Sequence, residues 1–224
     1  MDLPAGAAST PVEYEPVSVK DLLVEMKDTA ELLIDLAYSA VLHRNEELAA
    51  EVLRLERKMD VLEIRAQMSL LMAARSPSDA ETLAPVLGIV TATEQISDAA
   101  GDIAKIVRED IGLPEAMRAA LPEAVETLVR GVVAESSAYT DRTLGDIDLE
   151  SETGVRVIAL RRGDDWLLNP GRDTEIHGDD VAFLRGPETA VGEAYETLTA
   201  TPYDPPRLDV PAIEDLERAV DTIL

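Results

Sequence analysis

Pairs of carboxylates separated by four residues are the first feature of the sequence that could perform chemistry. Glu56 and Asp60 form one pair, Glu94 and Asp98 form another, and Asp102 follows four residues later. This spacing places the side chains on one face of a helix, where like charges repel by about a few tenths of a kcal/mol. A hard or borderline cation between two such helices would offset that repulsion, because carboxylate oxygens suit these metals. The pattern therefore indicates a candidate metal site between two helices.

A second interpretation of these acids remains open. The chain of 224 residues contains 45 Asp and Glu, so acidic pairs at a spacing of four are also expected by chance. Most such pairs lie on a solvated helix face. The candidate acids border the apolar stripes of their helices and do not lie opposite them, and this position supports the metal interpretation.

Three long amphipathic helices must position these acids. The first begins after an N-cap at Ser18, the second spans residues 46–74 and the third spans residues 80–109. In each helix one apolar stripe recurs at spacings of three and four: Leu22, Met26, Ala30, Leu33, Ala37 and Val41; Leu48, Val52, Leu55, Met59, Leu62, Ala66 and Leu70; Val86, Ile89, Thr93, Ile96, Ala100, Ile103 and Val107. Short connections predict an antiparallel bundle over residues 17–112.

Residues 153–189 change from helical to strand periodicity. Short apolar runs are separated by Gly163, by Asn169-Pro170-Gly171 and by His177-Gly178-Asp179, which are strand and turn signals. A strand is expected from Thr127 and a helix after Pro187. The predicted fold class is α+β: a three-helix antiparallel bundle, then a small α/β domain, then a short C-terminal helix.

The expected domain organisation follows from these patterns. It consists of a disordered leader (1–16), the bundle (17–112), a connector (113–126), the α/β domain (127–198), a Pro-rich linker (199–211) and an amphipathic helix (212–224).

The net charge of −25 limits the partners of the chain. Bare nucleic acid and anionic membrane surfaces would repel it, so we expect no nucleic-acid partner. An acidic surface suits either a salty cytoplasm or an acidic interaction module. We favour the first, because the acids are spread along the chain as in halophilic archaeal proteins. No apolar run reaches the length of a membrane span and no signal peptide is evident. The sequence therefore predicts a cytoplasmic protein without direct membrane insertion.

Few residues in the chain could support catalysis. Cysteine is absent, and histidine occurs only at positions 43 and 177. No nucleophile elbow, P-loop or dinucleotide fingerprint is found, and nothing combines a nucleophile, a base and an orienting group. We therefore predict that the protein is not an enzyme, and no cofactor follows from the residues alone.

Residues 17–112 resemble one three-helix repeat of the PhoU family, whose members carry an (E/D)xxxD motif on two helices. The matching pairs are Glu56 with Asp60 and Glu94 with Asp98, and Asp102 extends the row. In some members these carboxylates hold iron or other metals, so the resemblance implies a divalent or iron-type metal here. The family pattern has two repeats. A single repeat implies half the metal sites or a second half from a partner chain.

Residues 127–198 resemble the TrkA C-terminal domain, also called the RCK C-terminal (RCK-C) domain. The resemblance rests on GVRVIALRRGDDWLLNP (154–170), on RDTEIHGDDVAFLRGPE (172–188) and on Ser137 followed by Thr143-Leu144, with Asp141 replacing a usual glycine. Such domains regulate potassium and other cation transport systems. The nucleotide-binding half that often precedes them is missing, so no NAD is expected. The small sheet has an apolar face, and a homodimer through residues 127–198 would bury it.

The TrkA-C resemblance also implies a ligand, because several such domains bind cyclic di-AMP between two copies. The matching positions include two arginines, which can clamp phosphate, and an asparagine, which can bond an adenine edge. The candidates are Ile158, Arg161, Arg162, Asn169, Pro170 and His177. The alternative is that the arginines are solvated strand-end charges and Asn169 only shapes a turn.

Two functions remain in competition at this point. The first is a cytosolic regulatory subunit of a membrane potassium or cation transporter, peripheral to the membrane through that partner and sensing a small anionic ligand such as cyclic di-AMP. The second is a PhoU-like metal-binding adaptor in phosphate-transport signalling.

Overall fold

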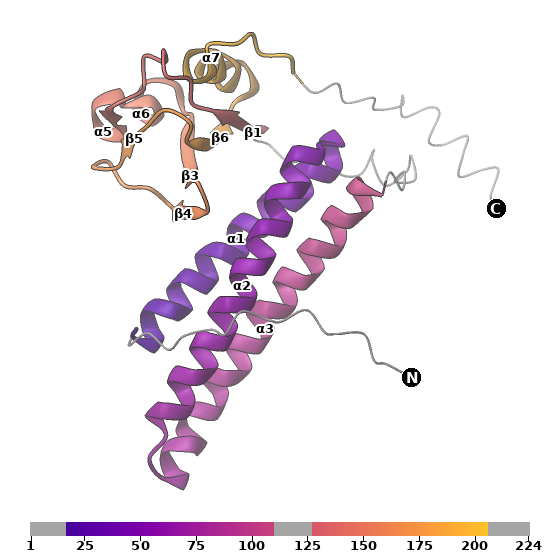
Figure 1. The fold of residues 1–224 in the computed structure, drawn as a ribbon, viewed down its shortest axis with the longest axis vertical. Coiled ribbons are helices and arrows are strands. Elements are labelled where there is room, and N and C mark those ends of the chain that lie inside the picture. The colour runs from indigo at the N-terminus through magenta and orange to yellow at the C-terminus, as the bar shows by residue number, and fades with distance from the viewer. Residues whose placement is uncertain (1–16, 110–126, 206–224) are drawn as a thin grey trace, which may run out of the picture.

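A bundle of three helices forms the first half of the protein. The computed structural model describes residues 17–109 and 127–205. Helices α1 (Val19–His43), α2 (Glu46–Ala73) and α3 (Pro77–Arg108) lie side by side (Figure 1). Each begins at a polar cap whose side chain accepts a backbone N–H: Ser18, as predicted, then Asn45 and Ser76.

The predicted apolar stripes of α1 and α2 are confirmed, since all of their residues are buried. The stripe predicted for α3 is wrong in part, because Ile89 and Ile96 are 56% and 42% exposed. The buried residues of α3 include Val90, Ser97 and Gly101 instead. These two stripes are one residue apart on the helix. Small residues let α3 approach α2 closely: a Cβ at Gly101 would come within 2.3 Å of the Glu56 carboxylate.

A four-stranded antiparallel sheet follows, in the order β1-β6-β3-β4. Its strands are β1 (Thr127–Val132), β3 (Arg156–Arg162), β4 (Asp165–Leu168) and β6 (Val181–Gly186). The pair β2 (Arg142–Thr143) and β5 (Glu175–Ile176), the short helices α5 (Leu144–Ile147) and α6 (Leu149–Thr153), and helix α7 (Glu188–Thr199) complete the domain. The predicted α+β fold is confirmed for these residues.

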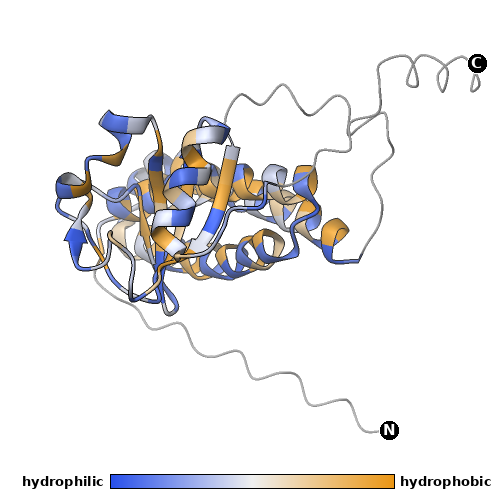
Figure 2. Ribbon diagram, turned by 90° about the horizontal axis from the view of Figure 1, so that it is seen from above, coloured by the Kyte–Doolittle hydropathy of each residue, from blue (hydrophilic) through white to orange (hydrophobic). Residues whose placement is uncertain are grey.

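The two faces of the sheet bury different partners. On one face, residues such as Val157, Leu160 and Leu184 pack with α7. On the other, Ile158, Phe183 and their neighbours join the core of the bundle, and apolar residues are found on helices and strands alike (Figure 2). The bundle therefore covers the apolar face that we expected a dimer to bury. A homodimer through residues 127–198 remains a prediction, but it needs another surface of that domain.

Several predicted segments lie outside the described residues. These are the leader (1–16), the connector (113–126), the second part of the linker (206–211) and the amphipathic helix (212–224). Among the helices in 17–109 and 127–205, none has the length and apolar character that crossing a bilayer requires.

Candidate functional site

A buried carboxylate on α2, Glu51, lies where the bundle meets the sheet. Glu51 stands three residues after Leu48 and four before Leu55, so it points in the same direction as the apolar stripe. Its side chain is 0% exposed. A charge removed from water in this way is costly unless it is paired and hydrogen-bonded. The surroundings of Glu51 therefore decide whether this interface is stable.

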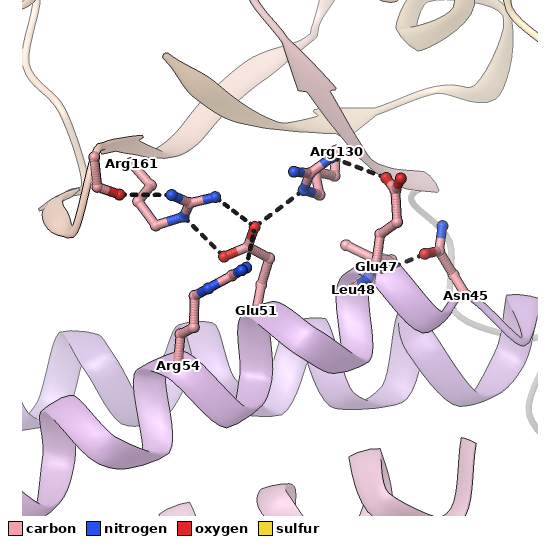
Figure 3. A network of polar contacts seen from close by, with 8 residues as sticks. Asn45, Glu47, Leu48, Glu51, Arg54, Arg130 and Arg161 are labelled. Carbon is pink, nitrogen blue, oxygen red and sulfur yellow. Dashed lines mark hydrogen bonds and ion pairs between the residues drawn. The ribbon is translucent and has the colours of Figure 1, made fainter. Parts of the chain in front are cut away.

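Three arginines converge on the Glu51 carboxylate (Figure 3). Arg161 on β3 donates from Nε to Oε2 at 2.8 Å and from Nη2 to Oε1 at 2.8 Å. Arg130 on β1 donates from Nε to Oε1 at 3.1 Å, and Arg54 on α2 lies 3.1 Å from the same oxygen. A two-point arginine–carboxylate pair is among the stronger polar contacts in proteins. We call Glu51, Arg54, Arg130 and Arg161 the Glu51 cluster.

The sheet brings its two arginines to the cluster by strand alternation. Arg130 and Arg161 both point from the sheet toward the bundle and are only 16% and 12% exposed. Arg130 also bonds Glu47 at 2.8 Å. The Arg161 guanidinium donates to the Gly163 carbonyl at 2.6 Å and lies 5.9 Å from the centre of the Trp166 ring. Arg161 is thus held from several sides.

The Glu51 cluster keeps its carboxylate ionised. Burial by itself would raise the pKa of Glu51. The hydrogen bond and charge of Arg161, with the hydrogen bond of Arg130 and the charge of Arg54, outweigh that effect and hold the pKa below its ordinary value. The cluster is therefore a charge-compensated contact between α2 and two strands.

A cleft of about 160 Å³ opens beside this interface, between α1 and the sheet. It contains two of the predicted ligand residues, Ile158 and Asn169, with Leu32 and Leu168 as apolar lining. Asn169 has a positive φ of 46°, and its N–H donates to the Ile158 carbonyl at 3.1 Å. The charged lining residues are of both signs: Asp28, Glu31, Asp35, Arg156 and Arg185. The cleft offers both an apolar wall and polar groups.

The other predicted ligand residues lie elsewhere. Arg161 belongs to the Glu51 cluster, and Pro170 lines a neighbouring cleft of about 200 Å³ with Arg172. Arg162 and His177 contact Asp180 in the β5–β6 region. The structure thus brings Ile158 and Asn169 together in one cleft and distributes the remaining four. Their role in ligand binding remains a prediction.

Arg162 and the buried Asp180 form a second ion pair within the sheet domain. Arg162 donates from Nε to Oδ1 at 2.8 Å and from Nη2 to Oδ2 at 2.7 Å, and the His177 N–H donates to Oδ2 at 2.9 Å. Burial alone would raise the pKa of Asp180, but these donors hold it below the ordinary value. The pair closes the turn before β6.

We expect Asp180→Asn to lower the free energy of unfolding by about 2 kcal/mol at neutral pH, because Arg162 loses its counter-charge and one of the two oxygens that accept its hydrogen bonds. The lowered pKa means that this stabilisation is present above the ordinary value of 3.8 and is lost as the pH falls. Urea unfolding at several pH values would measure it. The exposed neighbour provides a control, Asp179→Asn, which should change little. Equal losses in both variants would contradict the role of Asp180.

The predicted metal-binding acids are not gathered into a ligand set. The Lys105 ammonium lies 3.5 Å from Glu56 and 3.0 Å from Asp102, so these two acids are already paired with a cationic side chain of the protein. Burial and the nearby Asp98 raise the pKa of both Asp60 and Glu94. Within the described residues, no three acidic or histidine side chains are close enough to hold a metal ion. These residues do not fit a metal as placed, and we derive no function from one.

Glu51 was missed by sequence reasoning, although a signal was present. An acid at position 51 interrupts the apolar stripe between Leu48 and Leu55, and a charge within such a stripe indicates a buried ion pair. Its two partners on the sheet were not detectable in the same way, because Arg130 is 79 residues away in the chain and Arg161 is 110 residues away.

Two family models match the chain. Residues 23–107 match the PhoU domain and residues 128–199 match the TrkA-C domain. The PhoU model covers most of the helical bundle and the TrkA-C model covers the sheet domain, which agrees with the resemblance drawn from the sequence. None of the curated proteins compared is significantly similar to the chain.

Solved structures with similarity to the chain include RCK_C domains. One is the RCK_C domain dimer of S. agalactiae BusR in complex with c-di-AMP, with 20% identity over 32% of this chain and 91% of that chain and a TM-score of 0.29. Another is the RCK C domain of the potassium transport protein KtrA with c-di-AMP, with 16% identity, coverages of 35% and 89% and a TM-score of 0.31.

S. agalactiae BusR bound to its busAB promoter DNA is also similar, with 17% identity over 61% of this chain and 65% of that chain and a TM-score of 0.30. At these identities and TM-scores, the likenesses support no statement about the ligands or partners of this chain.

Proposed function

Taking residues 128–199 as a TrkA-C domain, we propose that the protein is a regulatory subunit of a cation transport system. Its sheet domain senses an anionic dinucleotide, cyclic di-AMP, through Arg161. The ligand competes with Glu51 for this arginine, so ligand binding weakens the contact between sheet and bundle. The partner is a membrane cation channel or transporter that responds to this change.

The two-point contact between Arg161 and Glu51 carries the proposal. A carboxylate bound by the Nε and Nη2 of arginine occupies the same two donors that would bind two oxygens of a phosphate. The Glu51 carboxylate therefore occupies the side of Arg161 where the family resemblance predicts a phosphate of the ligand. A phosphate can bind Arg161 in this geometry only if the Nε and Nη2 groups of Arg161 release the Glu51 carboxylate.

The cleft beside the interface suits the base of such a ligand. Leu32, Ile158 and Leu168 offer apolar contact to a purine, and the Asn169 amide can donate to and accept from an adenine edge. Entry of a base between α1 and β4 would act on the same interface that the Glu51 cluster closes. Base and phosphate binding would then favour the same separation of bundle and sheet.

Calorimetric titration of the full chain with cyclic di-AMP tests the proposal. We expect saturable binding that weakens at least roughly 30-fold in Arg161→Gln, because a charge-assisted phosphate contact is lost. The matched control is Arg75→Gln, which removes an arginine next to the α2–α3 turn and should not alter binding. Absence of binding to the folded wild-type chain at about 1 mM ligand would reject the proposal.

A further inference from the structure

A second apolar stripe runs along α3; over residues 85–99 it lies on the side that the bundle core does not use, and farther along Ile103 also packs against that core. Its residues follow each other at spacings of four and three, as in a coiled-coil seam: Pro85, Ile89, Ala92, Ile96, Ala99, Ile103 and Ile106. Residues 85 to 99 of this seam are exposed, and Ile103 and Ile106 are half-buried. At 1.5 Å per residue the seam is roughly 30 Å long. We call these residues the α3 seam.

The α3 seam is free of charge over most of its length. Between residues 85 and 100 the only charged residues are Glu94 and Asp98, and both interact electrostatically with acids of α2. Over the same residues, the positions that flank the seam are uncharged as well: Val86, Gly88, Thr93, Gln95 and Ala100; the next flanking residue, Asp102, is charged. A chain with a net charge of −25 would be expected to expose acids on a solvated face. A long neutral apolar stripe indicates a contact surface instead.

The sizes of the seam residues match a second copy of the same helix in antiparallel orientation. With a two-fold axis near residue 94, Ile89 lies opposite Ala99 of the partner and Ile96 lies opposite Ala92 of the partner. Each large side chain then meets a small one, as close packing requires. A parallel pairing would place isoleucine against isoleucine and alanine against alanine, which leaves alternating bulges and gaps.

We infer that two copies of this chain form a dimer through antiparallel packing of their α3 seams. Figure 1 shows α3 at the side of the bundle away from the sheet domain. The Glu51 cluster and the cleft beside it therefore lie outside the dimer contact in both copies, and the dimer does not depend on the proposed ligand. It is also separate from a dimer through residues 127–198.

Sedimentation equilibrium of the full chain tests this inference. We expect a dimer whose dissociation constant rises at least roughly 100-fold in Ala92→Glu and in Ile96→Glu, because each places unpaired charges in the seam. The matched control is Ala84→Glu, an equally exposed alanine of α3 outside the seam, and it should dimerise as the wild type does. Circular dichroism would verify that all variants are folded. The wild-type dimer should tighten as salt rises, because salt screens the repulsion between two acidic chains.

Two results would overturn the inference: a wild-type chain that is monomeric at about 100 μM in high salt, or a dimer that is unchanged by Ala92→Glu. Cross-linking tests the orientation, since the native chain contains no cysteine. Chains with Ala92→Cys should cross-link with chains carrying Ile96→Cys when the two are mixed. Cross-linking of each variant only with itself would indicate parallel pairing and contradict the antiparallel arrangement.

Discussion

Replacing Glu51 by glutamine should lower the free energy of unfolding of the full chain by about 3 kcal/mol. The substitution removes the negative charge on which three arginines converge and leaves Arg130 and Arg161 largely buried without their main counter-charge. Glutamine keeps the size of the side chain, so the loss reports on charge and hydrogen bonding. Urea unfolding in a buffer of fixed ionic strength measures it.

Glu47 offers the matched control for this measurement. It also pairs with Arg130, but its side chain is 72% exposed. Glu47→Gln should therefore cost less than about 1 kcal/mol. If the two variants lose the same amount, the burial of Glu51 does not govern the stability of the interface.

The effect of Glu51→Gln should also depend on pH. The folded-state pKa of Glu51 is lowered, so its stabilisation is fully present above the ordinary value of 4.5 and is lost as the pH falls through the folded-state value. The difference between wild type and variant should therefore be constant near neutral pH and shrink below 4.5. A difference that grows on acidification would contradict an ionised Glu51 in the folded protein.

The same substitution should raise the affinity for cyclic di-AMP by roughly 10-fold or more, because Arg161 no longer has to leave an internal anion. Arg161→Gln should have the opposite effect. If Glu51 and phosphate compete for one arginine, the same substitution should destabilise the fold and raise the affinity for the ligand. Titration of both variants, with Glu47→Gln as a control, would measure it.

Reciprocity makes this prediction sharper. If Glu51 weakens ligand binding, then the ligand must weaken the contact between bundle and sheet by the same factor. Equal affinities of wild type and Glu51→Gln would show that the ligand leaves the cluster intact. The proposed link between ligand sensing and bundle docking would then be wrong, even if binding itself is observed.

Much of the local architecture was predictable because it depends on neighbours in the chain. Ser18 caps α1, the stripe from Leu22 to Val41 is buried and Gly163 turns between β3 and β4 with a positive φ. Capping, periodicity and turn chemistry act over a few residues. On α3 the predicted stripe containing Ile89 and Ile96 was wrong in part, because these two residues are exposed and Val90 is buried. Hydrophobicity favoured Ile89, while close packing against α2 selected Val90 and Ser97.

By itself, the sequence determined that a helical unit is followed by a sheet unit, and which residue types are available for binding anions or metals. Only the tertiary structure decided which charges meet. In it, Arg161 pairs with Glu51, Arg162 pairs with Asp180, and Lys105 pairs with Glu56 and Asp102. The physical reason is that a buried charge must find its partner in space. For Glu51 that partner lies on a strand whose position depends on the packing of the whole sheet against the bundle.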